Sequence, residues 1–150
     1  MRVLFDTNII LDLFLDRAPF ADDAAALWQA NADGRLEGFV SAITPVNLFY
    51  IARRLKDRST AFQAVSEVIA ALSVCPLDHL TLQTALTLPF PDYEDAVQHA
   101  SATGNGLDAI VTRNIKDFVE ATIPVLSPAE LLVQLSDPSF QNRERNTRRK

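Results

Sequence analysis

With 150 residues, of which 48% are hydrophobic and 22% charged, the chain has the size and composition of one ordinary globular domain, which excludes a disordered protein. No apolar run reaches the roughly 18 residues that a membrane span needs, and the single cysteine, Cys75, excludes an internal disulfide, so we expect a cytoplasmic protein with no membrane partner. The net charge is −5, but it is unevenly distributed, because residues 143–150 hold five basic side chains and one acid. The rest of the chain has 9 basic and 18 acidic residues. This excess of acids argues against a general nucleic-acid binder, which usually has a basic face.

Short β-rich runs alternate with longer helical patterns along the chain, which predicts an α/β fold built from βαβ units around a parallel sheet. Several of the expected strands are apolar runs, as strands buried on both faces should be. We expect strands at 2–5, 38–41, 73–77, 109–112 and 124–126, and helices at about 8–15, 20–33, 45–57, 59–72, 78–86, 92–104, 115–119 and 128–135. Beyond Leu135 the pattern dissolves, so we divide the chain into a domain at 1–135 and a polar basic C-terminal tail at 136–150.

Three of these helices have a start signal in the sequence. Thr44 and Ser127 each precede a proline, which is tolerated at the first helical position because its missing N–H would be unpaired there. Asp92 follows Pro91 and can accept hydrogen bonds from the exposed N–H groups of the next turn. We therefore expect Thr44, Asp92 and Ser127 to be N-caps.

The first motif that could carry chemistry lies at residues 3–8, where an apolar strand ends on Asp6 and continues through Thr7 and Asn8 into a helix. In open parallel sheets, ligands bind at the carboxyl ends of the strands, near the point where the strand order reverses. Asp6 is therefore well placed to hold a hard cation. The same residue could instead merely cap the helix that follows it.

A second group of acids, Asp92, Glu94 and Asp95, lies within one helical turn. Helix N-termini favour negative charge, so acids gather there without any function. That explanation is strong for Asp92 and Glu94, and Asp95 is the better candidate for a site residue.

The third motif, at residues 110–118, repeats the architecture around Asp6, because an apolar strand ends in polar residues and passes into a short helix. Asn114 and Asp117 are its candidate site residues, although they could also be an N-cap and its capping-box partner. Arg113 could face a phosphate group or form an ion pair.

Taken together, the three motifs resemble the PIN domain family, and the segment 41–53 that leads from the second strand into a helix adds to the resemblance. The resemblance covers about residues 1–135 and is nearest to bacterial single-domain members, including the VapC-like toxins of toxin–antitoxin pairs. It implies a three-layer α/β/α sandwich with a central parallel sheet. It further implies a metal-dependent endoribonuclease that uses Mg²⁺ or Mn²⁺ as cofactor and RNA as substrate, and it allows an antitoxin protein as partner.

The resemblance also implies which residues would form the site. Asp6 matches the first acid of the family and Asp95 the third, whereas Asn47 stands where a glutamate is usual and Asn114 where many members have an aspartate, with Asp117 one turn later. The implied metal set is therefore Asp6, Asn47, Asp95, Asn114 and Asp117, with Asp6, Asp95 and Asp117 as the catalytic acids. An amide oxygen can ligate a cation but brings no charge, so we expect weaker metal binding than in a site with four acids.

Three functions remain open at this point. The first is the metal-dependent ribonuclease, and the second is a catalytically weakened domain that binds RNA or a protein. The third is another α/β enzyme, such as a phosphohydrolase. We would expect such an enzyme to have an aspartate two residues after Asp6, whereas this chain has Asn8 there. Leu48, Phe49 and Tyr50 are consecutive and cannot all face inward, so we also expect an apolar surface on the helix 45–57 and a homodimer built partly on it.

Overall fold

The computed structural model describes residues 1–139, so the basic run at 143–150 lies outside the described residues and the expected division at residue 135 remains a prediction. Five parallel strands form one sheet in the order β3-β2-β1-β4-β5. They are β1 (Arg2–Phe5), β2 (Glu37–Ser41), β3 (Ser73–Cys75), β4 (Ala109–Val111) and β5 (Val125–Leu126). All five expected strands are thus confirmed, with ends that shift by at most two residues.

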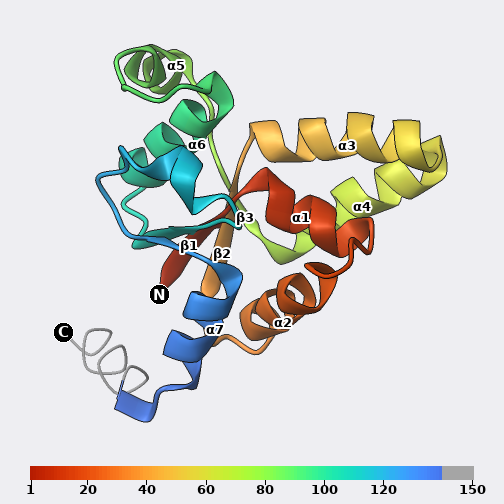
Figure 1. Ribbon diagram of the computed structural model, residues 1–150. Helices are drawn as coiled ribbons and strands as arrows, with labels where there is room; N and C mark the ends of the chain where they lie inside the picture. The colour runs from red at the N-terminus through yellow and green to blue at the C-terminus, as the bar shows by residue number, and fades with distance from the viewer. Residues whose placement is uncertain (140–150) are drawn as a thin grey trace.

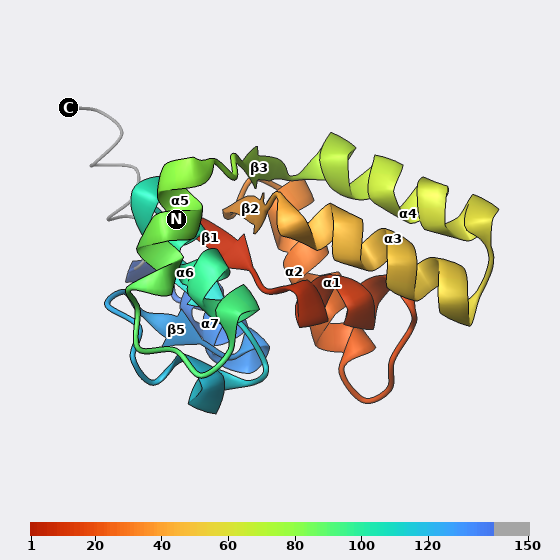
Figure 2. The ribbon, with the colours of Figure 1, turned by 90° about the horizontal axis from the view of Figure 1, so that it is seen from above.

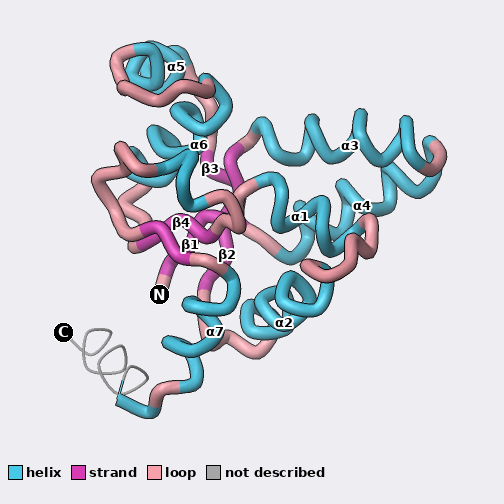
Figure 3. Tube along the Cα trace, viewed as in Figure 1, coloured by secondary structure: helices cyan, strands magenta, loops and turns pink. Residues whose placement is uncertain are grey.

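Seven α-helices and one 3₁₀ turn accompany the sheet in the described part of the chain (Figures 1 and 3). They are α1 (Thr7–Phe14), α2 (Ala21–Ala32), α3 (Ile43–Leu55), α4 (Arg58–Ala71), α5 (His79–Leu86), α6 (Tyr93–Gly104), the 3₁₀ turn η1 (Ile115–Phe118) and α7 (Pro128–Ser136). Helices lie on both faces of the sheet, which confirms the α/β/α sandwich. Among the described residues, no helix combines the length and the apolar character that crossing a membrane requires.

The two cores follow from the alternation of side chains along the strands. Val3 and Phe5 of β1 belong to a cluster that also contains Leu27 of α2 and Leu131 of α7. Leu4, between them, belongs to a second cluster on the other face. The strand order reverses at β1. The chain runs outward from β1 through β2 to β3 and then returns to β4 on the opposite side of β1, and the candidate site lies at this point. The carboxyl ends of β1 and β4 therefore border the crevice that such sheets leave for a ligand.

Helices α3 and α4 form an antiparallel hairpin that projects away from the strands (Figures 1 and 2). Phe49 of α3 and Phe62 of α4 contact each other, with ring centroids 4.8 Å apart. The hairpin joins the sheet at the start of α3, which follows β2, and at the end of α4, which precedes β3. Its far end, around the connection between α3 and α4, lies well away from the sheet (Figure 2).

Candidate active site

Asp6 occupies the N-cap position of α1, directly after β1, but its side chain does not cap the helix. One carboxylate oxygen, Oδ1, accepts a hydrogen bond from Nε2 of Gln98 at 3.0 Å, and Oδ2 accepts one from the hydroxyl of Thr112 at 2.6 Å. Only 6% of Asp6 is exposed. Burial raises the pKa of this carboxyl, and the hydrogen bonds from Thr112 and Gln98 oppose the rise. The explanation that Asp6 merely caps the helix is therefore wrong, because its carboxylate is held by Gln98 and Thr112, although the N–H groups of Thr7 and Asn8 lie near enough to lower its pKa.

The partners of Asp6 are themselves fixed by further hydrogen bonds. Thr112 follows β4, and its hydroxyl accepts from the Asn8 side chain at 3.3 Å and from the backbone N–H of Asn114 at 3.0 Å. Gln98 lies on α6 and accepts from the backbone N–H of Thr7 at 3.3 Å. Both Gln98 and Thr112 are fully buried. The orientation of the Asp6 carboxylate is thus set by α6 and by the end of β4 together.

Glu94 lies next to the candidate site, although the sequence explains it by the helix N-terminus alone. The Thr7 hydroxyl lies 3.0 Å from Oε1 of Glu94, to which it can donate, and 2.9 Å from the hydroxyl of Thr44. The expected N-cap at Thr44 is wrong, because α3 begins at Ile43, two residues earlier than expected, with Ala42 as N-cap, and the buried Thr44 side chain faces Thr7 instead. A carboxylate at the start of α6 that is held by α1 cannot be explained by the helix dipole alone.

Asp92 behaves as the sequence predicts. Its side chain accepts hydrogen bonds from the backbone N–H groups of Glu94, at 2.9 Å, and Asp95, at 3.2 Å. The expected cap at Ser127 is also confirmed, as a capping box with Glu130.

Asp95 lies among other carboxylates. Burial and the neighbouring charges of Asp6, Asp92, Asp117 and Glu94 raise the pKa of Asp95 to about 7. The charges of Asp6 and Asp117, which follow strands far apart in the sequence, thus both act on Asp95. Asp95 also lies one turn before Gln98 on α6, so its side chain projects from the same part of the helix as the amide that holds Asp6.

The two amide candidates have different surroundings. Asn47 is partly exposed and lies one turn after Thr44, so it projects from the side of α3 that contacts α1. Asn114 precedes η1 without a side-chain cap hydrogen bond, and the backbone N–H of Asp117 donates to its carbonyl at 3.0 Å. The capping-box explanation for Asn114 and Asp117 is therefore wrong. Asn114 thus follows the end of β4, and Asn47 lies in α3, which follows β2.

A model of the PIN domain matches residues 2–116 of the chain. The chain belongs to the PIN domain family. The resemblance recognised in the motifs is thereby confirmed. Among curated proteins, none matches this sequence.

Solved structures share the PIN fold over most of the chain. The toxin–antitoxin complex from Klebsiella pneumoniae is 25% identical, covers 84% of this chain and 97% of its own, and has a TM-score of 0.63. DNA-bound VapBC from Salmonella typhimurium is 19% identical, with 85% and 98% covered and a TM-score of 0.67. VapC20 from Mycobacterium tuberculosis, a Sarcin-Ricin loop cleaving toxin, is 13% identical, with 72% and 86% covered and a TM-score of 0.60.

The donor set of this PIN domain fits a hard cation that keeps much of its water. Within residues 1–139, no three Asp, Glu, His or Cys side chains converge closely enough to hold a metal ion by themselves. No Lys, Arg or His of that part of the chain forms an ion pair with Asp6, Glu94, Asp95 or Asp117. The side-chain oxygen of Asn8 is buried there without a partner. Mg²⁺ is usually held by one or two carboxylates together with waters and substrate phosphates, so the residues present fit such an ion.

Arg113 does not face the acidic cluster. Its Nε donates to Oδ2 of the buried Asp12 at 2.7 Å, and its guanidinium lies 4.3 Å from the ring centroid of Phe20. Of the two roles left open for Arg113, the ion pair is therefore the one observed. It ties the segment after β4, which carries Asn114 and Asp117, to α1.

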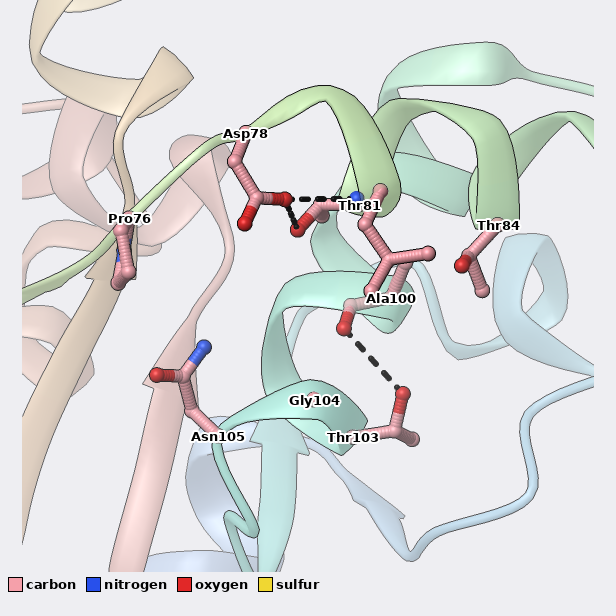
Figure 4. Close-up of a pocket in the computed structure, with 9 residues that line it drawn as sticks. Pro76, Asp78, Thr81, Thr84, Ala100, Thr103, Gly104 and Asn105 are labelled. Carbon is pink, nitrogen blue, oxygen red and sulfur yellow. Dashed lines mark hydrogen bonds between the residues drawn. The ribbon is translucent and has the colours of Figure 1, made fainter.

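Two hollows lie outside the acidic cluster. One, of about 250 Å³, separates α5 from α6 and is lined by Thr81, Thr84 and Thr103 among others (Figure 4). Two of its polar side chains bond within the chain, Thr81 to Asp78 and Thr103 to the carbonyl of Ala100 (Figure 4). The other, of about 480 Å³, is an almost wholly apolar groove between α3, α4 and β3. It confirms the expected apolar surface on α3, where Tyr50 is 63% exposed.

Proposed function

We propose that this PIN domain is a metal-dependent endoribonuclease and the toxin of a toxin–antitoxin pair. The observation that carries the proposal is the buried carboxylate of Asp6 after β1, which Gln98 and Thr112 hold in place close to further acids. Within residues 1–139, no Lys, Arg or His forms an ion pair with Asp6, Glu94, Asp95 or Asp117. Family membership supports a nuclease, and similarity to the complex from Klebsiella pneumoniae supports the toxin–antitoxin assignment. VapC20 adds a member of the same fold that cleaves the Sarcin-Ricin loop.

Asp6 and Asp95 would hold Mg²⁺ or Mn²⁺, with the oxygens of Asn47, Asn114 and Asp117 completing the set. When bound, such an ion activates water and neutralises the charge that builds up on a phosphodiester during hydrolysis. Because an amide brings no charge, the positions of Asn47 and Asn114 weaken the attraction for the ion, and the chain would need more metal than a site with four acids.

The remaining residues orient and tune these ligands. The hydroxyl of Thr112 and the amide of Gln98 each bond one oxygen of Asp6, which fixes the direction of the carboxylate. Burial and the neighbouring carboxylates raise the pKa of Asp95 to about 7, so this carboxyl would have to lose its proton when it ligates a cation. The Asp12–Arg113 ion pair keeps the segment with Asn114 and Asp117 against α1.

The test is cleavage of a mixed RNA pool by the purified chain with Mg²⁺, with Mn²⁺ and with EDTA, alongside thermal melts in the same buffers. We expect cleavage only with a divalent ion, and a higher Tm with that ion, because it binds the native state alone. If the chain neither cuts RNA nor responds to metal, the ribonuclease is excluded, and the weakened PIN domain that binds RNA or a protein takes its place.

A second proposal concerns assembly. We propose a homodimer in which the apolar groove contributes to the interface, because Val46, Tyr50 and Ile69 are each more than half exposed there and burying them removes apolar surface from water. Light scattering should give the mass of two chains, and Tyr50→Glu should shift it to one. A wild-type monomer at high concentration would contradict the proposal.

A further inference from the structure

The connection between α3 and α4 carries an unusual share of the positive charge. Of the nine basic residues outside the segment 143–150, four lie within residues 53–58, namely Arg53, Arg54, Lys56 and Arg58. We call these four residues the hairpin tip. All four are exposed, and they form the end of the hairpin that lies farthest from the sheet (Figures 1 and 2). The part of the protein that the structure describes is otherwise strongly acidic, and the hairpin tip gives it a basic end.

Ion pairs do not neutralise this charge. In the part of the chain that the structure describes, no acid forms a salt bridge with Arg53, Arg54 or Lys56. Asp57 lies among them, but its carboxylate accepts hydrogen bonds from the backbone N–H and the hydroxyl of Thr60, at 2.7 Å and 3.1 Å. The hairpin tip therefore presents four cations against one carboxylate that is already engaged.

Helix electrostatics explains only part of the cluster. Arg53 and Arg54 lie in the last turn of α3, where cations are favoured by the helix dipole. Lys56 is the C-cap residue of α3, which the same dipole favours. Arg58 is the first residue of α4, where the dipole disfavours a cation, and its guanidinium lies 5.2 Å from the ring centroid of Phe62. Arg58 is therefore the member of the hairpin tip that helix electrostatics does not explain.

The same helix connects the hairpin tip with the acidic cluster. Thr44, in the first turn of α3, contacts Thr7 next to Asp6, and Asn47 follows one turn later. Arg54 is seven residues beyond Asn47, so the two side chains project from nearly the same side of α3, about 10 Å apart along its axis. A gap of this size is spanned by a few phosphates of a nucleic-acid strand.

We propose that the hairpin tip binds the phosphate backbone of an RNA strand a few nucleotides from the bond that lies at the acidic cluster. The proposal rests on the proposed ribonuclease function and adds how the substrate is held. The carboxylates at the site repel RNA in the absence of metal, and a basic anchor on the same helix offsets this repulsion. Because Lys and Arg contacts to phosphates carry no sequence information, the tip positions the RNA and does not select its sequence.

The experiment compares the wild type with Arg54→Gln, with the triple variant Arg53→Gln/Arg54→Gln/Lys56→Gln, and with Arg35→Gln as control. Arg35 is also an exposed arginine, but it lies between α2 and β2 and pairs with Asp33 at 3.8 Å. Binding of a labelled single-stranded RNA of about 20 nucleotides is followed by fluorescence anisotropy in EDTA over a range of salt concentrations. Thermal melts establish that all four proteins are folded, which glutamine at these exposed positions should permit.

We expect the triple variant to bind RNA about tenfold more weakly at low salt, with a salt slope that is smaller by about 2, since each lost phosphate contact on a single strand removes about 0.7. Arg54→Gln should show about a third of the slope change, and Arg35→Gln almost none. With metal added, the triple variant should lose cleavage of the long RNA through a higher KM, and its kcat should change little.

Two results would overturn the proposal: no RNA binding by the wild type, or equal affinity and salt slope in the wild type and the triple variant. The second result would assign the hairpin tip to an acidic protein partner. RNA that binds through the tip but is never cut with any metal would remove the ribonuclease function and leave the anchor standing.

Discussion

Helices α1 and α6 both begin directly after an aspartate, yet the two carboxylates have different partners. Asp92 accepts the N–H groups of its own first turn, two and three residues away in the sequence. Asp6 accepts from Gln98 and Thr112, which are 92 and 106 residues away, and it is almost completely buried. Burial raises the pKa of Asp6, so its ionised carboxylate makes the fold less stable. That arrangement is understandable if a cation occupies the cluster when the protein acts.

The largest expected effect separates these two aspartates. Asp6→Asn should reduce metal-dependent RNA cleavage by at least about 100-fold, because even the partners behind a metal ligand are worth 10- to 100-fold. Asp92→Asn should cut RNA almost as well as the wild type, because asparagine is an equally good N-cap. Initial rates on the mixed RNA pool give both numbers. Equal losses in the two variants would mean that Asp6 has no special role.

A smaller effect is expected when a charge is added on α3. Asn47→Glu should bind Mn²⁺ about tenfold more tightly, because one more unit charge near the ion contributes about 1 kcal/mol or more even when well solvated. Asn47→Gln has nearly the same shape without the charge and is the matched control. The shift of Tm with Mn²⁺ concentration measures both. If the glutamate and glutamine variants respond alike, Asn47 does not face the ion.

The smallest expected effect is on stability as a function of pH in EDTA. The pKa of Asp95 is about 7 in the folded protein, above its ordinary value of 3.8, so the folded state binds more protons than the unfolded state between these values. Stability should therefore fall as the pH rises through this window, by a few degrees in Tm between about pH 5 and pH 8. Asp95→Asn should flatten the curve, and Asp92→Asn should flatten it less, since Asp92 supplies one of the repelling charges. A wild-type curve that is already flat would contradict the crowding of carboxylates.

The fold was predictable because local patterns and tertiary packing agree along most of the chain. The strands are short apolar runs, and Asp92 and Ser127 combine cap chemistry with the correct helix start. The prediction that Thr44 caps α3 is wrong because its hydroxyl could serve either the helix end or a tertiary partner. The local sequence favours a cap at the helix end, but the Thr44 side chain is buried beside Thr7 and needs a hydrogen-bond partner there. Leaving a buried hydroxyl without a partner costs more free energy than leaving a helix end uncapped.

The candidate site was predictable in part. Asp6 and Asp95 follow from the motifs, whereas Gln98 and Glu94 depend on how α6 lies against α1, which no local pattern reveals. Gln98 lies in a run that the structure shows to be buried from Ala96 to Ala102. A buried amide needs partners for both its donor and its acceptor, and Asp6 and the backbone N–H of Thr7 supply them. The sequence alone gave no prediction for Gln98.

The long sequence separation between Asp6 and Thr112 also determines at which stage of protein synthesis the candidate site can form. During synthesis β1 is made first, but the hydroxyl that orients its terminal carboxylate is 106 residues away. Until β4 has paired with β1, Asp6 has no Thr112 beside it, and the acids of α6 have no fixed neighbour across the crevice. A growing or truncated chain that lacks β4 therefore cannot contain the assembled site, so a ribosome making this protein carries no finished acidic cluster until most of the domain has been produced.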